Sequence, residues 1–185
     1  MKPKIIILPG NGAGDIEEKH WYAWARDQLK NKGFEVIAEN MPSPELAEKF
    51  FWVPHLKNKF KADNNTIVIG HSSGGLAALR YLEKNKLLGI IIVGVNNTDL
   101  GYEEEKLSGY FDNPWQWKKI KKNIKWIIHF ASQDDPYIPI KEQRFIHQQL
   151  DSEYHEYIDR GHFGSEYKSD KKFPELIKVI LRKTK

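Results

Sequence analysis

A serine set between glycines is the residue of this chain best suited to attack a carbonyl group. Residues 70–74 read Gly-His-Ser-Ser-Gly and match the pattern G-x-S-x-G, with Ser72 at its centre. A motif centred on Ser73 would need glycine at position 71, which is His71. In this pattern a strand turns sharply into a helix, and a strained backbone holds the serine above the edge of the sheet. The plainer alternative is a turn whose serine only caps the following helix.

A serine hydroxyl needs a general base beside it, and the base needs a carboxylate that orients it. Where this turn occurs, the chain order is serine, then acid, then histidine. Three histidines follow the first loop that could supply the acid. His147 falls within a helical pattern and His155 within a strand pattern, whereas His162 lies in a loop that follows a strand, R-G-H-F-G. We therefore predict that His162 is the base; the alternative is a loop histidine with no partner.

The acid is expected in the segment A-S-Q-D-D-P-Y-I-P, residues 131–139. Asp134 and Asp135 are both candidates, and Pro136 restricts the backbone beside them. The carboxylate of the acid would accept the Nδ1 hydrogen of His162 and stabilise the imidazolium that forms during proton transfer. Aspartates that precede proline in loops also often form turns or cap helices, so this reading stays open for both.

The negative oxygen that forms during attack needs two hydrogen-bond donors. The backbone N–H of Ser73, the residue after the nucleophile, is one, and we place the second at Asn11 in the loop after the first strand. That loop, P-G-N-G-A-G-D at residues 9–15, also resembles a dinucleotide-binding turn. Its spacing is G-x-G-x-G instead of G-x-G-x-x-G, which disfavours a nucleotide-binding enzyme. Neither a zinc motif H-E-x-x-H nor a phosphate-binding motif G-x-x-x-x-G-K occurs, so we expect no metal and no cofactor.

The elements that must position these residues alternate along the chain. The expected strands cover residues 4–8, 34–38, 67–69, 88–93, 125–130 and 153–158. The expected helices cover residues 20–31, a segment from 43 onward, a segment after Gly74, a short one opened by 113–114, 140–150 and 173–181. The helix from 43 onward should bury Leu46, Phe50 and Val53 on one stripe, and Pro54 should kink or interrupt it.

Alternating strands and helices predict an α/β fold, a three-layer α/β/α sandwich with a six-stranded, mainly parallel sheet. Ligands in such sheets bind beyond the carboxyl ends of the strands. The loops 9–15, 70–74, 131–139 and 159–165 all emerge at that edge. Residues 96–112 are polar, are expected to be irregular, and would lie over the same edge.

Size and composition limit the other classes of function. The chain has 185 residues, enough for one well-packed domain, which we expect to span 1–185. It contains no cysteine, which excludes disulfides, thiolate metal sites and cysteine nucleophiles. The first residues do not form a signal peptide and the longest apolar stretch, 87–95, cannot span a bilayer, so we expect a cytoplasmic protein that does not bind membranes. The net charge of +4 is best explained by solvated lysines rather than by nucleic-acid binding.

Taken together, the longer motifs of the chain resemble the retinoblastoma-binding protein 9 type of small α/β-hydrolase. The matching segments are P-G-N-G-x-G-D at 9–15, W-Y-x-W at 21–24, N-M-P-x-P at 40–44, I-G-H-S-S-G at 69–74, S-G-Y-F at 108–111, P-W-Q-W-x-K-I-K at 114–121, D-D-P at 134–136 and G-H-F at 161–163. The resemblance implies a serine hydrolase with a minimal fold and little or no lid. It implies Ser72 as nucleophile, His162 as base and Asp135, the aspartate next to the proline, as acid.

This family is described as acting on small esters and amides, including aminoacyl esters and aromatic aminopeptidase-like substrates. Its mammalian member carries an L-x-C-x-E segment that binds the retinoblastoma protein. The corresponding residues here, Phe60-Lys61-Ala62-Asp63-Asn64, lack both the cysteine and the glutamate. Binding to that protein is therefore not expected.

Two tryptophans are candidates for the substrate pocket. Trp115 and Trp117 follow the irregular segment 96–112, and we predict that at least one of them lines an apolar or aromatic pocket. The alternative is that they pack helices onto the sheet.

The sequence thus predicts a serine hydrolase that cleaves a small carboxylic ester or amide through an acyl-enzyme. Transfer of the acyl group to an acceptor other than water would use the same residues. The alternative from another class is a non-catalytic protein-interaction module that retains the fold, because a fold alone does not define a function.

Overall fold

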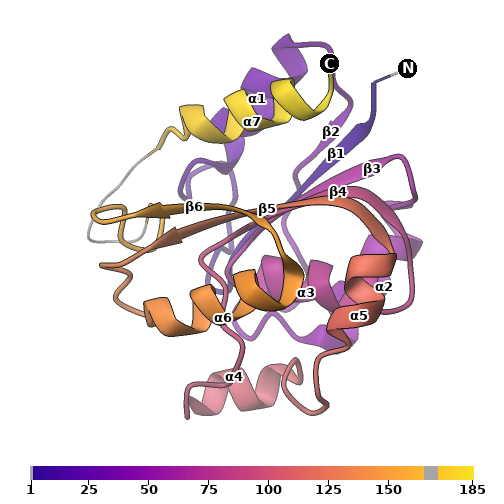
Figure 1. Ribbon diagram of the computed structural model, residues 1–185. Coiled ribbons are helices and arrows are strands. Elements are labelled where there is room, and N and C mark those ends of the chain that lie inside the picture. The colour runs from indigo at the N-terminus through magenta and orange to yellow at the C-terminus, as the bar shows by residue number, and fades with distance from the viewer. Residues whose placement is uncertain (1, 165–170) are drawn as a thin grey trace.

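The described part of the chain, residues 2–164 and 171–185 of a computed structural model, forms a parallel sheet with helices on both faces (Figure 1). The strands are β1 (Lys4–Leu8), β2 (Val36–Ile37), β3 (Thr66–His71), β4 (Leu87–Val93), β5 (Ile124–Ser132) and β6 (Glu153–Tyr157). The helices are α1 (Tyr22–Asn31), α2 (Lys49–Asn58), α3 (Ser73–Leu82), α4 (Glu103–Ser108), α5 (Trp117–Lys122), α6 (Ile140–Leu150) and α7 (Pro174–Lys183).

The six strands lie in the order β2-β1-β3-β4-β5-β6, and every neighbouring pair is parallel. The predicted three-layer sandwich is therefore confirmed. β3 lies inside the sheet between β1 and β4, and all of its residues are buried. Its run of β-branched side chains, Thr66 to Ile69, suits a strand that is covered on both faces.

Two hydrophobic cores lie on opposite faces of the sheet. α1 and α7 cover one face, and α2, α3, α5 and α6 cover the other (Figure 1). Alternate strand residues serve the two cores, so that Ile67 and Ile69 contact the first layer while Val68 contacts the second. Because the strands are parallel, their carboxyl ends and the loops that follow them share one edge of the sheet. The last residue of the expected loop 159–165 lies outside the described residues.

The helix expected from residue 43 begins later than predicted, at Lys49. Ser43 and Ala47 have φ angles of 47° and 51°, which a right-handed helix does not allow, and residues 44–47 form a turn instead. The helix then continues through Pro54 to Asn58 and does not end at the proline.

The buried stripe predicted for that helix is also wrong. Phe50 is 77% exposed, whereas Trp52 and Leu56, four residues apart, are completely buried. Trp52 and Leu56, four residues apart, lie on the same side of the helix and form its inward face, and Val53 packs at the margin of the core.

The segment 96–112, expected to be irregular, contains the helix α4. Three successive glutamates occupy its first turn, where the helix dipole favours negative charge. Gly109 ends the helix with a φ of 77°, a conformation that glycine adopts readily. In Figure 1 α4 lies beyond the layer formed by α3 and α6, farther from the sheet than those helices.

Other predicted boundaries differ by a few residues. The first helix begins at Tyr22, because His20 has a φ of 49°. The second strand is reduced to Val36–Ile37, and the short helix expected to open at Pro114 begins at Trp117. Across the described ranges, none of the helices combines the length and the apolar character that crossing a membrane requires.

Candidate active site

The backbone at Ser72 is strained where β3 turns into α3. Its φ of 51° and ψ of −123° lie outside the regions that non-glycine residues prefer, and its N–H donates a 2.9 Å hydrogen bond to the carbonyl of Val93. The turn needs both glycines of G-x-S-x-G. A Cβ at Gly70 would lie 2.5 Å from the carbonyl oxygen of Gly74, and a Cβ at Gly74 would lie 2.5 Å from the carbonyl oxygen of Pro9.

The loops after β5 and β6 bring a carboxylate to an imidazole. His162 Nδ1 lies 2.8 Å from Asp135 Oδ2, and the Asp135 side chain is fully buried. The other carboxylate oxygen, Oδ1, accepts the backbone N–H groups of Tyr137 and Ile138, both at 3.0 Å. Because a carboxylate only accepts, His162 carries its hydrogen on Nδ1 and leaves Nε2 able to take a proton.

The neighbouring carboxylate, Asp134, has different partners. Its Oδ1 accepts hydrogen bonds from the Ser132 hydroxyl at 2.6 Å and from the backbone N–H of Gly161 at 2.7 Å. Asp134 therefore anchors the loop that carries His162, while Asp135 contacts the imidazole itself. The local pattern left these two roles open, and the family resemblance implied Asp135 as the acid.

The other two histidines considered for the base have partners of their own outside the cavity described below. His147 Nδ1 lies 3.1 Å from the hydroxyl of Ser152, and His155 Nε2 lies 2.9 Å from a carboxylate oxygen of Glu153. Neither lines the cavity that contains Ser72.

The loop after β1 lies against the serine turn. The Ser73 hydroxyl donates a 3.2 Å hydrogen bond to Asn11 Oδ1. Gly12, with a φ of 71°, donates its N–H to the carbonyl of Pro44 at 2.8 Å. These contacts bring together the two residues, Asn11 and Ser73, whose backbone N–H groups were predicted to hold the oxyanion.

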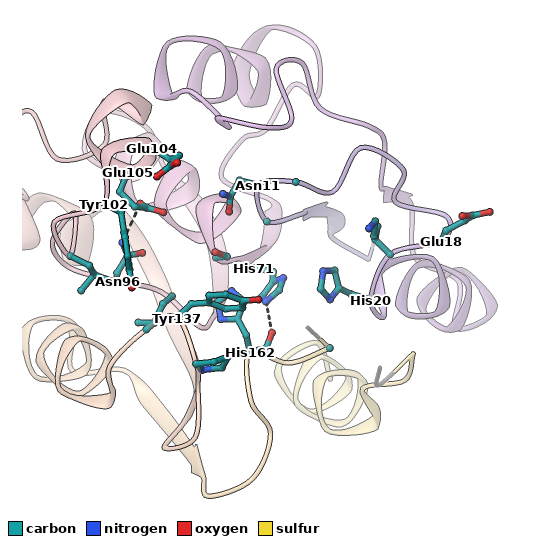
Figure 2. Close-up of a pocket in the computed structure, with 18 of the residues that line it drawn as sticks. Asn11, Glu18, His20, His71, Asn96, Tyr102, Glu104, Glu105, Tyr137 and His162 are labelled. Atoms are coloured by element: carbon teal, nitrogen blue, oxygen red, sulfur yellow. Dashed lines mark hydrogen bonds between the residues drawn. The ribbon is translucent and has the colours of Figure 1, made fainter. Parts of the chain in front are cut away.

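A cavity of about 820 Å³ opens above these loops, and Ser72, His162 and Asn11 all line it (Figure 2). No hydrogen bond joins the Ser72 hydroxyl to His162 in this structure; in enzymes without substrate such contacts are often long and tighten on binding. Tyr137 packs edge-on against the His162 ring, with 5.3 Å between the ring centroids.

One wall of the cavity comes from α4 and the residues around it, which sequence reasoning missed. Figure 2 shows Asn96, Tyr102, Glu104 and Glu105 gathered on this side. The Asn96 amide donates a 3.2 Å hydrogen bond to Glu105 Oε2, and burial raises the pKa of Glu105. The sequence placed the segment 96–112 over this edge of the sheet, but it predicted neither the helix nor these individual residues.

The opposite wall includes His20, another residue that sequence reasoning missed. Burial lowers the pKa of His20 to about 4, so its imidazole is neutral near pH 7. Among the described residues, no group of three or more His, Asp or Glu side chains is arranged to hold a metal ion.

Trp115 and Trp117 do not line this cavity, contrary to the prediction. Their rings stack on each other with centroids 5.3 Å apart, and both pack against the core on the α3 side of the sheet. The Arg80 guanidinium lies 3.8 Å over the Trp115 ring, and Trp115 Nε1 donates to the carbonyl of Asn97. These contacts fix the tryptophans as packing residues, the alternative that the sequence had also allowed.

The fold and the site together are typical of α/β-hydrolases. A parallel sheet lies between two layers of helices, with a strained serine after β3, a buried aspartate after β5 and a histidine after β6. The chain belongs to the serine hydrolase family, whose model matches residues 5–181. It is 44% identical over 178 residues to serine hydrolase RBBP9 of Rattus norvegicus, which covers 96% of this chain and 93% of that protein.

Solved structures share the fold. The ydeN gene product of Bacillus subtilis is 26% identical and superposes with a TM-score of 0.86 over 99% of this chain and 98% of that chain. An esterase from Exiguobacterium antarcticum, 9% identical, shares the fold with a TM-score of 0.68 over 97% of this chain and 92% of its own. The chain therefore has an α/β-hydrolase fold and is a hydrolase, and its resemblance to the retinoblastoma-binding protein 9 type is confirmed.

Proposed function

We propose that this hydrolase cleaves small carboxylic esters or amides through an acyl-enzyme, with Ser72 as nucleophile, His162 as base and Asp135 as the orienting acid. The observation that carries the proposal is the 2.8 Å contact between His162 Nδ1 and the buried Asp135 carboxylate, in a cavity that also contains the strained Ser72. Acyl transfer by a serine needs a base beside the hydroxyl and a carboxylate that orients the base, and this arrangement supplies both.

The chemistry follows from these positions. His162 Nε2 takes the Ser72 proton as the hydroxyl oxygen bonds to the carbonyl carbon, and the backbone N–H groups of Asn11 and Ser73 hold the resulting oxyanion. The imidazolium then gives its proton to the leaving alcohol or amine, which departs and leaves an acyl-Ser72 ester. Water attacks that ester with the same base, and the carboxylic acid is released.

The walls of the cavity support aminoacyl or aromatic acyl groups as substrates. Tyr102 and Tyr137 offer aromatic faces, and the carboxylate of Glu105 is held at one oxygen by Asn96 while the other oxygen has no protein partner among the described residues. A carboxylate in that position suits the ammonium group of an aminoacyl ester. We further propose a cytoplasmic location for this activity.

The experiment that tests the proposal is labelling with a fluorophosphonate, which reacts with activated serines. Wild-type protein should be labelled and Ser72→Ala should not. Ser152→Ala is the matched control, because Ser152 is also a buried serine beside a histidine, His147, but lies away from the cavity. Folded wild-type protein that resists labelling would contradict the proposal.

A substrate panel then identifies the acyl and leaving groups. Turnover of p-nitrophenyl esters of increasing chain length would be compared with that of aminoacyl esters and arylamides. Added alcohol or amine acceptors would separate hydrolysis from acyl transfer, because transfer yields a new ester or amide in place of the free acid. We expect aromatic acyl groups to be accepted, since Tyr102 and Tyr137 line a cavity of about 820 Å³.

A further inference from the structure

Two buried side chains, Tyr22 and His71, connect the loops on either side of the serine turn. The backbone N–H of Gly10 donates to Tyr22 Oη at 3.0 Å, and Tyr22 Oη lies 2.6 Å from His71 Nδ1. His71 Nε2 lies 2.9 Å from the backbone carbonyl of His162 (Figure 2). Tyr22 is fully buried and His71 is 1% exposed. None of the steps proposed above uses either side chain.

The chemistry of the groups gives each hydrogen bond one direction. The carbonyl of His162 can only accept, so His71 carries a hydrogen on Nε2. Burial lowers the pKa of His71 well below its ordinary value, so the ring is neutral and Nδ1 is an acceptor. The Tyr22 hydroxyl therefore donates to Nδ1, and its oxygen accepts from Gly10. Each group therefore donates to the next, from the Gly10 N–H through Tyr22 and His71 to the carbonyl of His162.

These hydrogen bonds end at the two loops that carry Asn11 and His162, which must be held in place for the proposed catalysis. Gly10 begins the loop that carries Asn11, and His162 lies in a loop where Gly161 and Phe163 both have positive φ angles, 51° and 52°. Phe163, unlike a glycine, pays a steric cost in that conformation, so the surrounding contacts must maintain it. Trp21, the residue before Tyr22, adds a second contact by donating its indole N–H to the Phe163 carbonyl at 2.9 Å.

We propose that Tyr22 and His71 are positioning residues that hold the oxyanion loop and the base loop in register with Ser72. The inference rests on the proposed function and deepens it. His71 suits this role because it directly precedes Ser72 in the chain, so the hydrogen bonds attach both loops to the nucleophile turn itself. The alternative is that Tyr22 and His71 stabilise the fold without affecting the alignment of the site.

Tyr22→Phe tests the proposal, because it removes one hydroxyl and leaves the ring in place. We expect kcat for a p-nitrophenyl ester to fall by about 10–100-fold, as misplacing catalytic groups by about 1 Å does elsewhere, while KM changes less than twofold. Tyr81→Phe is the matched control: Tyr81 is buried and donates to the Ala62 carbonyl at 2.7 Å, remote from the cavity. It should lower the melting temperature to a similar degree and leave kcat unchanged.

A rescue experiment separates positioning from packing. His71→Gln supplies an amide N–H for the His162 carbonyl and an amide oxygen for the Tyr22 hydroxyl, whereas His71→Leu supplies neither. If the hydrogen bonds of Tyr22 and His71 position the two loops, the glutamine variant should keep a kcat at least tenfold above that of the leucine variant. Equal kcat values for two folded variants would overturn the proposal.

Nitrogen NMR of the histidine rings provides a readout that does not depend on activity. In the wild type, His71 should carry its hydrogen on Nε2 with Nδ1 bare, and the Nδ1 signal should shift in Tyr22→Phe. A hydrogen on Nδ1, or a Tyr22→Phe variant as active as Tyr81→Phe, would overturn the inference. Failure of the proposed function looks different, because the wild type itself would then neither react with the fluorophosphonate nor turn over an ester.

Discussion

The two adjacent aspartates after β5 make different contacts, although they are the same residue type. Asp135 directs one oxygen to His162 and the other to two backbone N–H groups, whereas Asp134 holds Gly161 and Ser132. The two carboxylates are neighbours in sequence and close in chemistry, so their variants are a sensitive test of the proposed roles.

Asp135→Asn should lower kcat by about 10³–10⁴-fold, because an amide in this place can donate to His162 and favour the wrong tautomer. Asp134→Asn keeps an acceptor oxygen for Gly161 and should lower kcat by less than tenfold. Steady-state rates with a p-nitrophenyl ester measure both effects. Equal losses in the two variants would contradict the division of roles.

Glu105 offers a second test at this scale, directed at the choice of substrate. Glu105→Gln is nearly isosteric and can keep the contact with Asn96, but it removes the negative charge from the cavity wall. We expect kcat/KM for aminoacyl esters to fall by about 10–100-fold, the usual value of a hydrogen bond to a charged group, while p-nitrophenyl acetate is cleaved as before. A parallel loss on both substrates would show that Glu105 serves the fold or the catalytic step instead.

Some of these residues can be predicted from sequence and others cannot. The sequence marks Ser72 by its glycines, and chain order and loop context mark His162. The choice between Asp134 and Asp135 needed either a family resemblance or coordinates. The sequence placed the segment 96–112 over the site, but it did not predict the helix α4 within that segment, and so it did not single out Glu105.

At the scale of elements, the close approach of α3 to β1 at Gly74 controls the geometry of the nucleophile turn. Gly74→Ala would place a methyl group 2.5 Å from the Pro9 carbonyl oxygen, so backbone must move. We expect a loss of about 1–3 kcal/mol or more in the free energy of unfolding and a large loss of activity. Gly14→Ala, where no atom lies within 4 Å of the added group, should change neither.

Urea unfolding curves and fluorophosphonate labelling of both alanine variants provide the measurements. Gly14→Ala controls for adding a methyl group in a loop near the site. A Gly74→Ala protein as stable and as reactive as the wild type would mean that the turn tolerates a much wider approach than the structure indicates.

The elements themselves were predictable where the hydrophobic pattern was long and regular. β1 has the predicted bounds because Ile5–Leu8 form a continuous apolar run that Pro9 ends, and α6 because its buried residues recur on one face of the helix. The helix expected from residue 43 began late, since a capping pattern does not report the positive φ angles of Ser43 and Ala47. Trp115 was assigned to the pocket from its chain position, but its partner Arg80 is distant in sequence and decides where it packs.

At the scale of the whole molecule, buried neutral histidines make stability depend on pH. Burial lowers the pKa of His129 to about 3 and that of His20 to about 4. The unfolded chain protonates these rings below about pH 6.5, so unfolding takes up protons in that range. Their contribution is complete above pH 6.5 and is lost progressively as the pH falls toward 4 and then 3.

His129→Leu should reduce this dependence. His129 is completely buried beside Tyr154, at 5.1 Å between ring centroids, and makes no hydrogen bond with the described residues. We expect the difference in unfolding free energy between pH 8 and pH 5 to shrink by about 2 kcal/mol, or about 1.4 kcal/mol for each pH unit below 6.5. Urea unfolding at the two pH values measures it.

Phe130→Leu is the control, because Phe130 is buried in the same strand and carries no titratable group. It should lower stability equally at both pH values. An unchanged pH dependence in His129→Leu would mean that this imidazole is protonated to the same extent before and after unfolding.

The position of β6 has a consequence for how activity is lost on heating. β6 borders the described sheet, pairs only with β5 there, and leaves every one of its residues partly exposed, whereas β3 is buried throughout. His162, the proposed base, therefore follows a strand at the partly exposed margin of the sheet, whereas Ser72, the proposed nucleophile, follows a strand in its buried interior. On mild heating, β6 and the loop that follows it should unfold locally before the rest of the sheet. Activity should then be lost at a temperature at which circular dichroism still reports a folded protein.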